Sequence, residues 1–295
     1  MRNTFSKEIT ALASRDPRIV LLSGDIGNKL FDDFKKIAPD RFYNCGVAEA
    51  NMVGVAAGMA LTGLRPVTYT ITSFATVRCL EQIRVDLCYH NLPVLVVGTG
   101  SGLSYTELGP THHSCEDVGL LRMLPNMAIV CPCDPVETRL AVRAAMSWNG
   151  PVYLRLGKKG EPAVHPAPPE FRIGRSITVR GGNDACILST GSVMPMSLEV
   201  ADMLLGSGIT ARVESFHTVK PLDVERLREI QGRYPVVATV EEHSRIGGLG
   251  GSVAEWMADH PNRNSRLLRF GTEDRFLNEV GSQEYARRRH GLTKE

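Results

Sequence analysis

Short apolar runs rich in β-branched residues alternate with longer segments of helical character along the whole chain. In order, these runs are residues 19–22, 65–71, 93–97, 127–130, 186–188, 210–213 and 236–240. Two parallel strands need a crossover connection, and a helix usually provides it. The alternation therefore predicts an α/β fold with parallel or mostly parallel sheets.

The alternation lapses between residues 157 and 175, where glycine, lysine and several prolines replace the apolar runs. Prolines remove backbone donors and hold a chain extended, as in an interdomain linker. A chain of 295 residues, 43% of them hydrophobic, is long enough for two domains with cores of their own. We predict a first domain at residues 1–160, a linker at 161–178 and a second domain at 179–295.

Composition excludes several classes of protein. The 34 basic and 32 acidic side chains give a net charge of +2 without a basic block, which argues against binding to nucleic acid or to an anionic membrane. The polar start lacks the apolar core of a secretion signal, and no apolar run could span a bilayer, so we expect a cytoplasmic protein.

Seven cysteines lie mostly in apolar segments, which suits reduced thiols in a core. Cys131 and Cys133 are the nearest approach to a ligand pair, but their spacing is not the C-x-x-C of a zinc site and no second pair exists. The sequence predicts no metal ligands in this chain.

Two glycine clusters precede segments that could be helical, at residues 98–102 and 247–251. In the first cluster, a loop that needs positive φ is favoured over a dinucleotide-binding turn, because a Gly-Pro pair follows where a helix should begin. The second cluster could present helix N–H groups to an anion or could simply permit a tight turn and close packing.

Glu49 begins a Gly- and Ala-rich apolar segment that follows a short predicted strand. A glutamate in the first turn of a helix meets the positive end of the helix dipole, so an exposed cap residue is one interpretation. If the carboxylate is instead buried beside this apolar helix, it needs a partner or a proton. Glu49 is therefore a candidate site residue.

Two further candidates lie on predicted loops or strand ends. His112 and His113 follow a Gly-Pro turn, where imidazoles suit proton transfer, although an exposed histidine pair is the alternative. Phe74 follows the strand predicted at residues 65–71 and could stack on a ligand ring or belong to the core.

These pieces, in this order and at these intervals, resemble the transketolase family in its pyrimidine-binding and C-terminal domains. The resemblance covers nearly the whole chain, and its C-terminal part is also similar to 1-deoxyxylulose-5-phosphate synthase. It rests on residues 22–27, 44–49, 72–74, 91–113, 124–135, 220–223, 240–244 and 246–250.

The resemblance implies chemistry on thiamine diphosphate. Glu49 matches the glutamate that hydrogen-bonds the pyrimidine ring nitrogen, and Phe74 matches the aromatic residue that stacks on that ring. His112 matches the histidine near the thiazolium and the substrate oxygens, and His113 is expected to assist it. Asp25, in the motif at residues 22–27, is assigned to cofactor binding.

Departures from the family pattern concern the substrate. Leu108 stands where an aspartate usually binds a substrate hydroxyl, and Ser101 lies where basic or histidine side chains often meet a sugar phosphate. Lys158 lies where an arginine does that work, so one phosphate contact can persist. The resemblance therefore implies a sugar-like substrate that is less hydroxylated or unphosphorylated.

The family's diphosphate and metal motif belongs to an N-terminal domain that this chain does not contain. We therefore predict a transketolase-like transferase completed by an N-terminal subunit, which holds the diphosphate through Mg²⁺ or Ca²⁺. Self-association through the pyrimidine-binding domain would give an α2β2 heterotetramer that transfers a two-carbon ketol unit. The alternatives are the β subunit of a 2-oxo acid dehydrogenase and a catalytically inactive regulatory subunit.

Overall fold

Each of the seven apolar runs contributes to a largely buried strand, as expected of parallel sheets covered on both faces. The computed structural model describes residues 1–158, 160–261 and 264–295. The strands are β1 (Ile19–Ser23), β2 (Phe42–Asn44), β3 (Arg65–Ile71), β4 (Leu95–Thr99), β5 (Ala128–Val130), β6 (Val152–Leu156), β7 (Ile177–Arg180), β8 (Ala185–Thr190), β9 (Ala211–Ser215), β10 (Thr218–Lys220), β11 (Val236–Ser244) and β12 (Arg266–Thr272).

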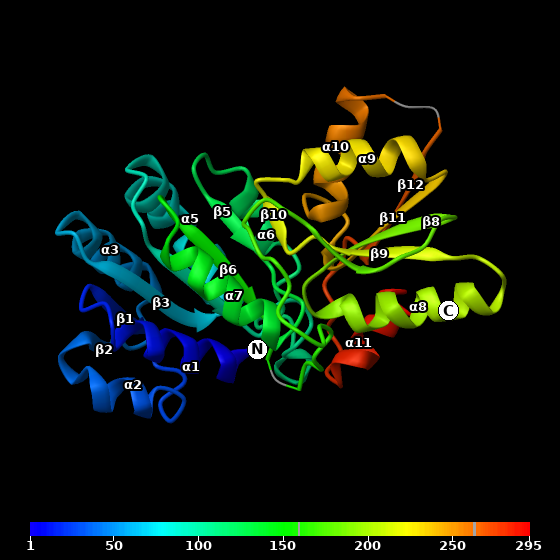
Figure 1. Ribbon diagram of the computed structural model, residues 1–295. Coiled ribbons are helices and arrows are strands. Elements are labelled where there is room, and N and C mark those ends of the chain that lie inside the picture. Colours follow the sequence, from blue (N-terminus) through cyan, green and yellow to red (C-terminus); the bar gives the residue numbers. More distant parts are fainter. Residues whose placement is uncertain (159, 262–263) are drawn as a thin grey trace.

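Helices lie between most of these strands, and short helical turns complete the connections (Figure 1). The α-helices are α1 (Arg2–Ala13), α2 (Asp32–Ile37), α3 (Glu49–Leu61), α4 (Thr72–Thr76), α5 (Leu80–Gln82), α6 (Asp117–Arg122), α7 (Pro135–Met146), α8 (Met194–Gly206), α9 (Val224–Arg233), α10 (Leu249–Asp259) and α11 (Gln283–Arg289). The turns are η1 (Pro39–Arg41), η2 (Val77–Cys79), the π-helix η3 (Ile83–Tyr89), η4 (Thr106–Leu108) and η5 (Gly191–Val193).

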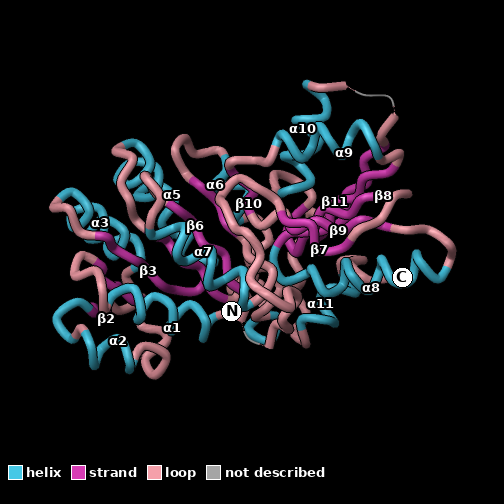
Figure 2. Tube along the Cα trace, viewed as in Figure 1, coloured by secondary structure: helices cyan, strands magenta, loops and turns pink. Residues whose placement is uncertain are grey.

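The strands form two sheets that lie side by side (Figure 2). The seven-stranded sheet has the order β10-β5-β6-β4-β3-β1-β2, and only the β10–β5 pair is antiparallel. The five-stranded sheet has the order β12-β11-β8-β9-β7, and only the β7–β9 pair is antiparallel. The predicted α/β class with mostly parallel sheets is confirmed. Strand β7 begins inside the segment predicted as linker.

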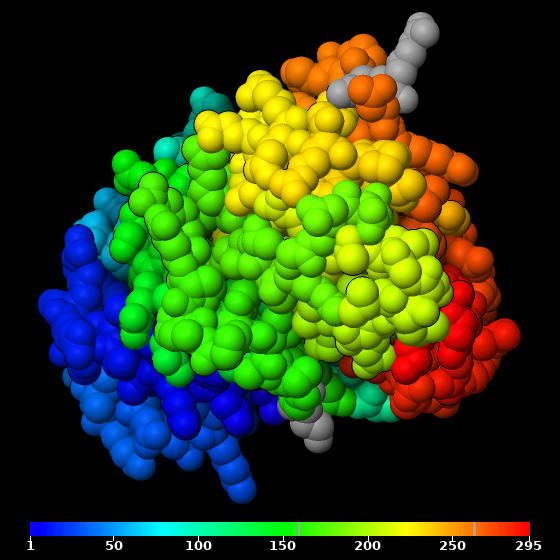
Figure 3. All heavy atoms as spheres, turned by 45° about the vertical axis from the view of Figure 1, so that its right-hand side comes forward, coloured from blue at the N-terminus to red at the C-terminus, as the bar shows by residue number. Residues whose placement is uncertain are grey.

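Helices cover both faces of each sheet. Helices α1, α2 and α7 pack with one face of the larger sheet, and α3, η3 and α6 pack with the other. In the smaller sheet, α8 lies on one face and α9 and α10 on the other. The core around α3 continues without interruption into the core beneath α9 and α10, so the two sheet units pack closely against each other, as the space-filling view also shows (Figure 3).

The junction between the two units is polar as well as apolar. Strand β10 comes from the second half of the chain but forms the edge of the first sheet. Arg155, on β6, is buried and donates to both carboxylate oxygens of Asp117 at 2.7 and 3.1 Å. It also donates to the backbone oxygen of Glu242, in β11, at 3.0 Å. A buried cation therefore joins α6 and both sheets.

The glycine clusters have structural roles. Gly102 has a φ of 61°, and a Cβ there would lie 2.4 Å from Oε1 of Glu242, so the loop interpretation of the first cluster is confirmed. In the second cluster, the backbone N–H groups of Leu249 and Gly250 donate to the carboxylate of Glu241 at 2.7 and 2.8 Å. The group that accepts from this helix N-terminus is thus a carboxyl of the protein itself.

Among the residues that the structure describes, no helix combines the length and the apolar character needed to cross a membrane.

Candidate functional site

Glu49 lies at the first position of α3, where the chain turns after β2, and its side chain is only 1% exposed. It packs at the carboxyl ends of β1 and β3. A Cβ on Gly24, just after β1, would lie 3.3 Å from Cγ of Glu49 and 2.9 Å from Oγ1 of Thr70. Glycine at residue 24 therefore leaves the room that the buried carboxylate occupies, and the interpretation of Glu49 as an exposed cap is wrong.

The buried carboxylate of Glu49 has a cationic partner. Arg78 donates from Nη1 to Oε2 of Glu49 at 2.8 Å, and Oγ1 of Thr70 lies 3.5 Å from the other carboxylate oxygen. The guanidinium carbon of Arg78 is also 4.4 Å from the ring centroid of Phe74. The Arg78 side chain is 44% exposed. A planar cation thus contacts both the Glu49 carboxylate and the Phe74 ring, and solvent reaches it.

Phe74 also contacts the loop that carries the predicted histidines. The ring centroids of Phe74 and His112 are 5.2 Å apart at an interplanar angle of 66°. The hydroxyl of Ser73 donates to the backbone oxygen of Thr111 at 3.3 Å, which ties this loop to α4. The structure therefore brings Glu49, Phe74 and His112 into one continuous chain of contacts.

His113 has different surroundings from its neighbour. It is buried, and its Nε2 has no hydrogen-bond partner among the described residues. Burial lowers the pKa of His113, and the nearby imidazoles of His290 and His112 lower it further. His113 lines a groove of about 610 Å³ between the two sheet units, with Leu103 and Phe276 among the other lining residues.

The remaining predicted site residues differ in their exposure to solvent and in their partners. Asp25 follows β1, is exposed, and accepts a hydrogen bond from Nδ2 of Asn44 at 2.9 Å. Ser101 is buried, and Leu108 is 49% exposed. Lys158 forms an ion pair with Glu107.

Tyr105 connects Lys158 with the histidine loop. The Nζ of Lys158 lies 4.7 Å from the ring centroid of Tyr105, and that ring is 6.3 Å from the ring of His112. The ring of Tyr105 therefore lies between Lys158 and His112. Among the four residues predicted to contact substrate, Lys158 and His112 are thus linked through Tyr105, which the sequence analysis did not select.

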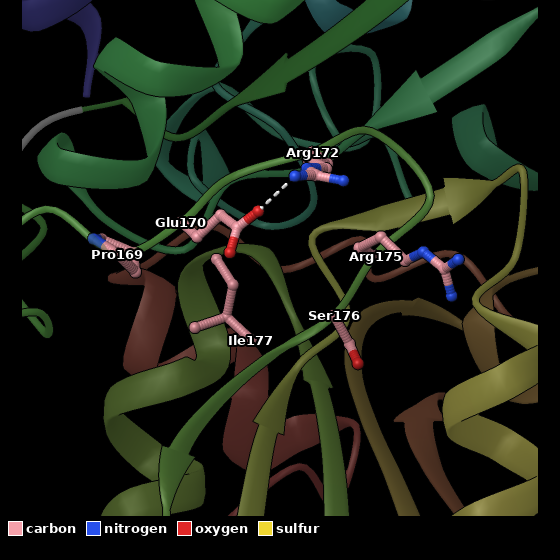
Figure 4. Close-up of a pocket in the computed structure, with 6 residues that line it drawn as sticks. All are labelled: Pro169, Glu170, Arg172, Arg175, Ser176 and Ile177. Carbon is pink, nitrogen blue, oxygen red and sulfur yellow. Dashed lines mark ion pairs between the residues drawn. The ribbon is translucent and has the colours of Figure 1, made fainter.

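A pocket of about 510 Å³ lies elsewhere, on the segment that joins the two sheet units (Figure 4). Glu170 and Arg172 in its wall form an ion pair at 2.7 Å. None of the predicted site residues lines it. Its wall is made of linker residues, so we do not assign the site to this pocket.

Arg78 and Tyr105 are the site residues that sequence reasoning missed. Arg78 follows Phe74 by four residues, and in a helical segment this spacing places two side chains on one face. That spacing was the available signal for Arg78. Tyr105 lies in a loop without periodicity, and no local pattern indicates its position.

Comparisons with known proteins identify the family. The model of the transketolase pyrimidine-binding domain matches residues 1–161, and that of the transketolase C-terminal domain matches residues 174–295. The chain is 37% identical to the 6-deoxy-6-sulfo-D-fructose transketolase subunit SqwH of Clostridium sp. over 99% of this chain and 90% of that protein. It is 37% identical to an apulose-4-phosphate transketolase subunit of Phocaeicola vulgatus, over 88% of this chain and 84% of that protein.

Solved structures agree with the sequence comparison. A split-gene transketolase, described as an inactive β4 tetramer, superposes with a TM-score of 0.91 at 37% identity and covers 99% of this chain and 94% of that chain. The transketolase of Campylobacter jejuni has the same fold, with a TM-score of 0.80 at 17% identity, and this chain corresponds to 45% of it. The chain therefore belongs to the transketolase family and comprises its pyrimidine-binding and C-terminal domains.

Proposed function

We propose that this chain is the C-terminal subunit of a split transketolase-like enzyme that transfers a two-carbon ketol unit between sugar-like molecules on thiamine diphosphate. The observation that carries the proposal is the convergence of Glu49, Phe74 and His112 at the carboxyl ends of the parallel strands. In open α/β sheets, ligands bind outside these strand ends. The names of the similar transketolase subunits point to the same reaction class.

The residues present fit an aminopyrimidine. The guanidinium of Arg78 is a planar, nitrogen-bearing group that bonds to the Glu49 carboxylate and faces the Phe74 ring. An aminopyrimidine is likewise planar, offers nitrogen atoms at its edge, and can stack on an aromatic face. Thiamine diphosphate, when bound, supplies a carbon that can form a carbanion and an electron sink for the transferred unit.

Each of the candidate site residues then has a definite role. Glu49 holds the pyrimidine nitrogen, and its burial keeps water from competing for that hydrogen bond. Phe74 supports the ring by stacking. His112 moves a proton at a substrate oxygen, and His113 behind it is held neutral by its lowered pKa.

The outer positions would shape recognition of the substrate. Lys158 offers a cation to an anionic group, and Tyr105 keeps it beside His112. Leu108 gives an apolar wall without a hydrogen-bonding group, while Ser101 and Asp25 stay as proposed contacts to substrate and cofactor. We expect a ketose with few hydroxyl groups near Leu108 and with one anionic group at most.

A partner subunit would supply the diphosphate and metal ligands. In the part of the chain that the structure describes, the one group of three potential metal-ligating side chains is Cys133, Glu137 and His165, and none of these contacts Glu49 or Phe74. We therefore propose that an N-terminal subunit contributes Mg²⁺ or Ca²⁺, and that two copies of each subunit form an α2β2 assembly. The β4 tetramer of the similar split-gene transketolase is described as inactive, which supports the need for a partner.

Reconstitution tests this proposal. The chain is combined with an N-terminal transketolase subunit, thiamine diphosphate and Mg²⁺, and ketose donors are screened for ketol transfer to an aldehyde acceptor. We expect transfer only when both subunits are present. Glu49→Gln should abolish donor cleavage while the subunits still assemble, whereas the exposed Glu81→Gln should behave as wild type.

The alternatives give different results in the same experiment. Release of CO₂ from pyruvate or a branched 2-oxo acid would assign the chain to a 2-oxo acid dehydrogenase. Assembly without reaction on any donor would support a regulatory subunit. Full turnover by this chain alone would refute the need for a partner.

A further inference from the structure

Three potential metal ligands meet in a buried cluster formed by Cys133, Glu137 and His165. Nε2 of His165 lies 2.9 Å from Oε1 of Glu137 and 3.9 Å from Sγ of Cys133. The three ligand atoms all lie within 4.8 Å of one another. All three side chains are buried, so the cluster is not a chance grouping of mobile surface residues.

Local structure holds these ligands in place. Asp134 caps α7 by accepting from the backbone N–H of Glu137 at 2.7 Å, and its other oxygen accepts from the N–H groups of Val164 and His165 at 2.8 and 3.1 Å. This fastens the linker against the start of α7 and brings His165 over the helix. Glu137 accepts from the N–H of Cys133 at 2.8 Å, which fixes its carboxylate beside the thiol.

The second sheet unit packs against the thiol of this cluster. Cys133 belongs to one buried apolar cluster with Met194 of α8 and Val213 of β9. The three potential ligands therefore lie where the two units meet, shielded from solvent.

We propose that Cys133, Glu137 and His165 form a binding site for a divalent transition metal, with Zn²⁺ as the natural occupant and a fourth coordination position left open to water. Ligand–zinc distances of about 2.0 Å for nitrogen and oxygen and about 2.3 Å for sulfur place tetrahedral ligands about 3.3 Å (N to O) and 3.5 Å (N to S) apart. The observed nitrogen–oxygen distance of 2.9 Å is shorter than this geometry, and the observed nitrogen–sulfur distance of 3.9 Å is longer. Each of these two distances would change by about 0.4 Å on metal binding.

The chemistry of the ligands selects the metal. A thiolate, an imidazole and one carboxylate suit Zn²⁺, whereas Mg²⁺ and Ca²⁺ require mainly oxygen ligands. On binding, the Cys133 thiol gives its proton to water and the sulfur donates an electron pair to the metal, so that thiolate and carboxylate together balance the charge of the ion. Within the described ranges, none of the hydrogen bonds that these three ligands make involves Glu49 or Phe74 of the proposed cofactor site.

Occupation of this site would fasten the linker to the first sheet unit, next to the contact with the second unit. Cys133 and Glu137 belong to the first unit and His165 to the linker, and Cys133 shares an apolar cluster with Val213 of the second unit. The competing possibility is that the His165–Glu137 ion pair is a structural contact only. That possibility predicts no metal uptake.

Cobalt binding distinguishes the two. The full chain is treated with chelator, freed of Mg²⁺ and thiamine diphosphate, and titrated with Co²⁺ while absorption is recorded. We expect a saturable thiolate-to-cobalt charge-transfer band in the near ultraviolet, with one Co²⁺ per chain and displacement by one Zn²⁺. Because no cofactor or substrate is present, the result does not depend on the proposed function.

Matched variants complete the test. Cys133→Ser should lose the charge-transfer band and bind at least about tenfold more weakly, while Cys131→Ser, at another buried thiol two residues earlier, should keep both. His165→Asn provides a second variant if serine impairs folding, and circular dichroism checks the fold of each. Absence of a saturable band in the wild-type chain, or an unchanged band in Cys133→Ser, would overturn the proposal.

Discussion

Arg78 offers the sharpest test of the site, because its guanidinium contacts the two groups that we propose bind the aminopyrimidine. It bonds to Glu49 at 2.8 Å and lies 4.4 Å from the Phe74 ring centroid. Binding of the pyrimidine as proposed requires this side chain to move away. Replacing Arg78 with alanine should therefore strengthen cofactor binding.

The expected change in cofactor affinity follows from the Arg78 contacts that cofactor binding would break. A hydrogen bond to a charged group contributes about 1.5–3 kcal/mol, and a cation–π contact at an exposed site contributes about 0.5–1 kcal/mol. The 44% exposure of Arg78 reduces the first value through solvent screening, and the side-chain entropy regained on release offsets part of both. A net effect of about 1–2 kcal/mol remains, which is a roughly 5- to 30-fold decrease in Kd for thiamine diphosphate.

The same substitution should destabilise the free chain. Without Arg78, the carboxylate of Glu49 is buried and has lost its cationic partner, so the free energy of unfolding should fall by about 1–3 kcal/mol. Tighter cofactor binding together with a less stable free chain distinguishes this role from a purely structural one. A structural role would weaken both properties.

Calorimetric titration of the reconstituted complex and urea unfolding of the free chain measure the two effects. Arg84→Ala, at another exposed arginine in the same segment, is the control and should change neither. A weaker affinity for thiamine diphosphate in Arg78→Ala would refute the reasoning. Arg78 would then contribute to binding of the cofactor instead of competing with it.

Three further predictions concern catalysis, the junction and pH. His112→Ala should slow donor cleavage about a hundredfold in stopped-flow assays without altering cofactor affinity, and unchanged kinetics would assign His112 to structure. Asp117→Asn leaves Arg155 buried without its counter-ion and should lower the free energy of unfolding in urea by about 3–5 kcal/mol, a larger loss than an exposed Asp33→Asn control gives. Burial raises the pKa of Glu241 to about 7, so the stability it contributes is present at low pH and is lost as pH rises through 7. Chemical unfolding between pH 5 and 9 should show a fall of up to about 3 kcal/mol that Glu241→Gln largely removes, and equal slopes in both proteins would contradict this origin.

Most strands that sequence reasoning located are buried on both faces, and the exception is the short edge strand β2 that precedes Glu49. Strand β6 escaped notice because it carries Arg155, whose charge is neutralised by Asp117 from a distant segment. Strands β7, β10 and β12 lie at sheet edges, where part of the surface is exposed and the apolar run is short. These four strands form by pairing with strands that are distant in the sequence, and local hydrophobic periodicity does not indicate such pairing.

The functional candidates likewise include some residues that the sequence indicates and others that only tertiary contacts bring together. Glu49 could be selected because a carboxylate beside an apolar helix needs an explanation, and the structure supplies it in Arg78. The cluster at Cys133 could not be recognised, because Glu137 resembles an ordinary helix residue and His165 lies in a proline-rich segment. Its ligands converge only because Asp134 binds the linker backbone.

The second sheet unit has a direct part in positioning the histidine loop. The carboxylate of Glu242, in β11, accepts from the backbone N–H of Leu103 at 2.8 Å and from Nε2 of Gln283 at 2.8 Å, and it pairs with Arg287 of α11. Gly102 permits this approach because it has no side chain. The loop that ends at His112 is therefore anchored at its start by the second unit, while its far end contacts Phe74 of the first. Both units therefore contribute contacts to the loop that carries His112, whereas Glu49 and Phe74 belong to the first unit alone.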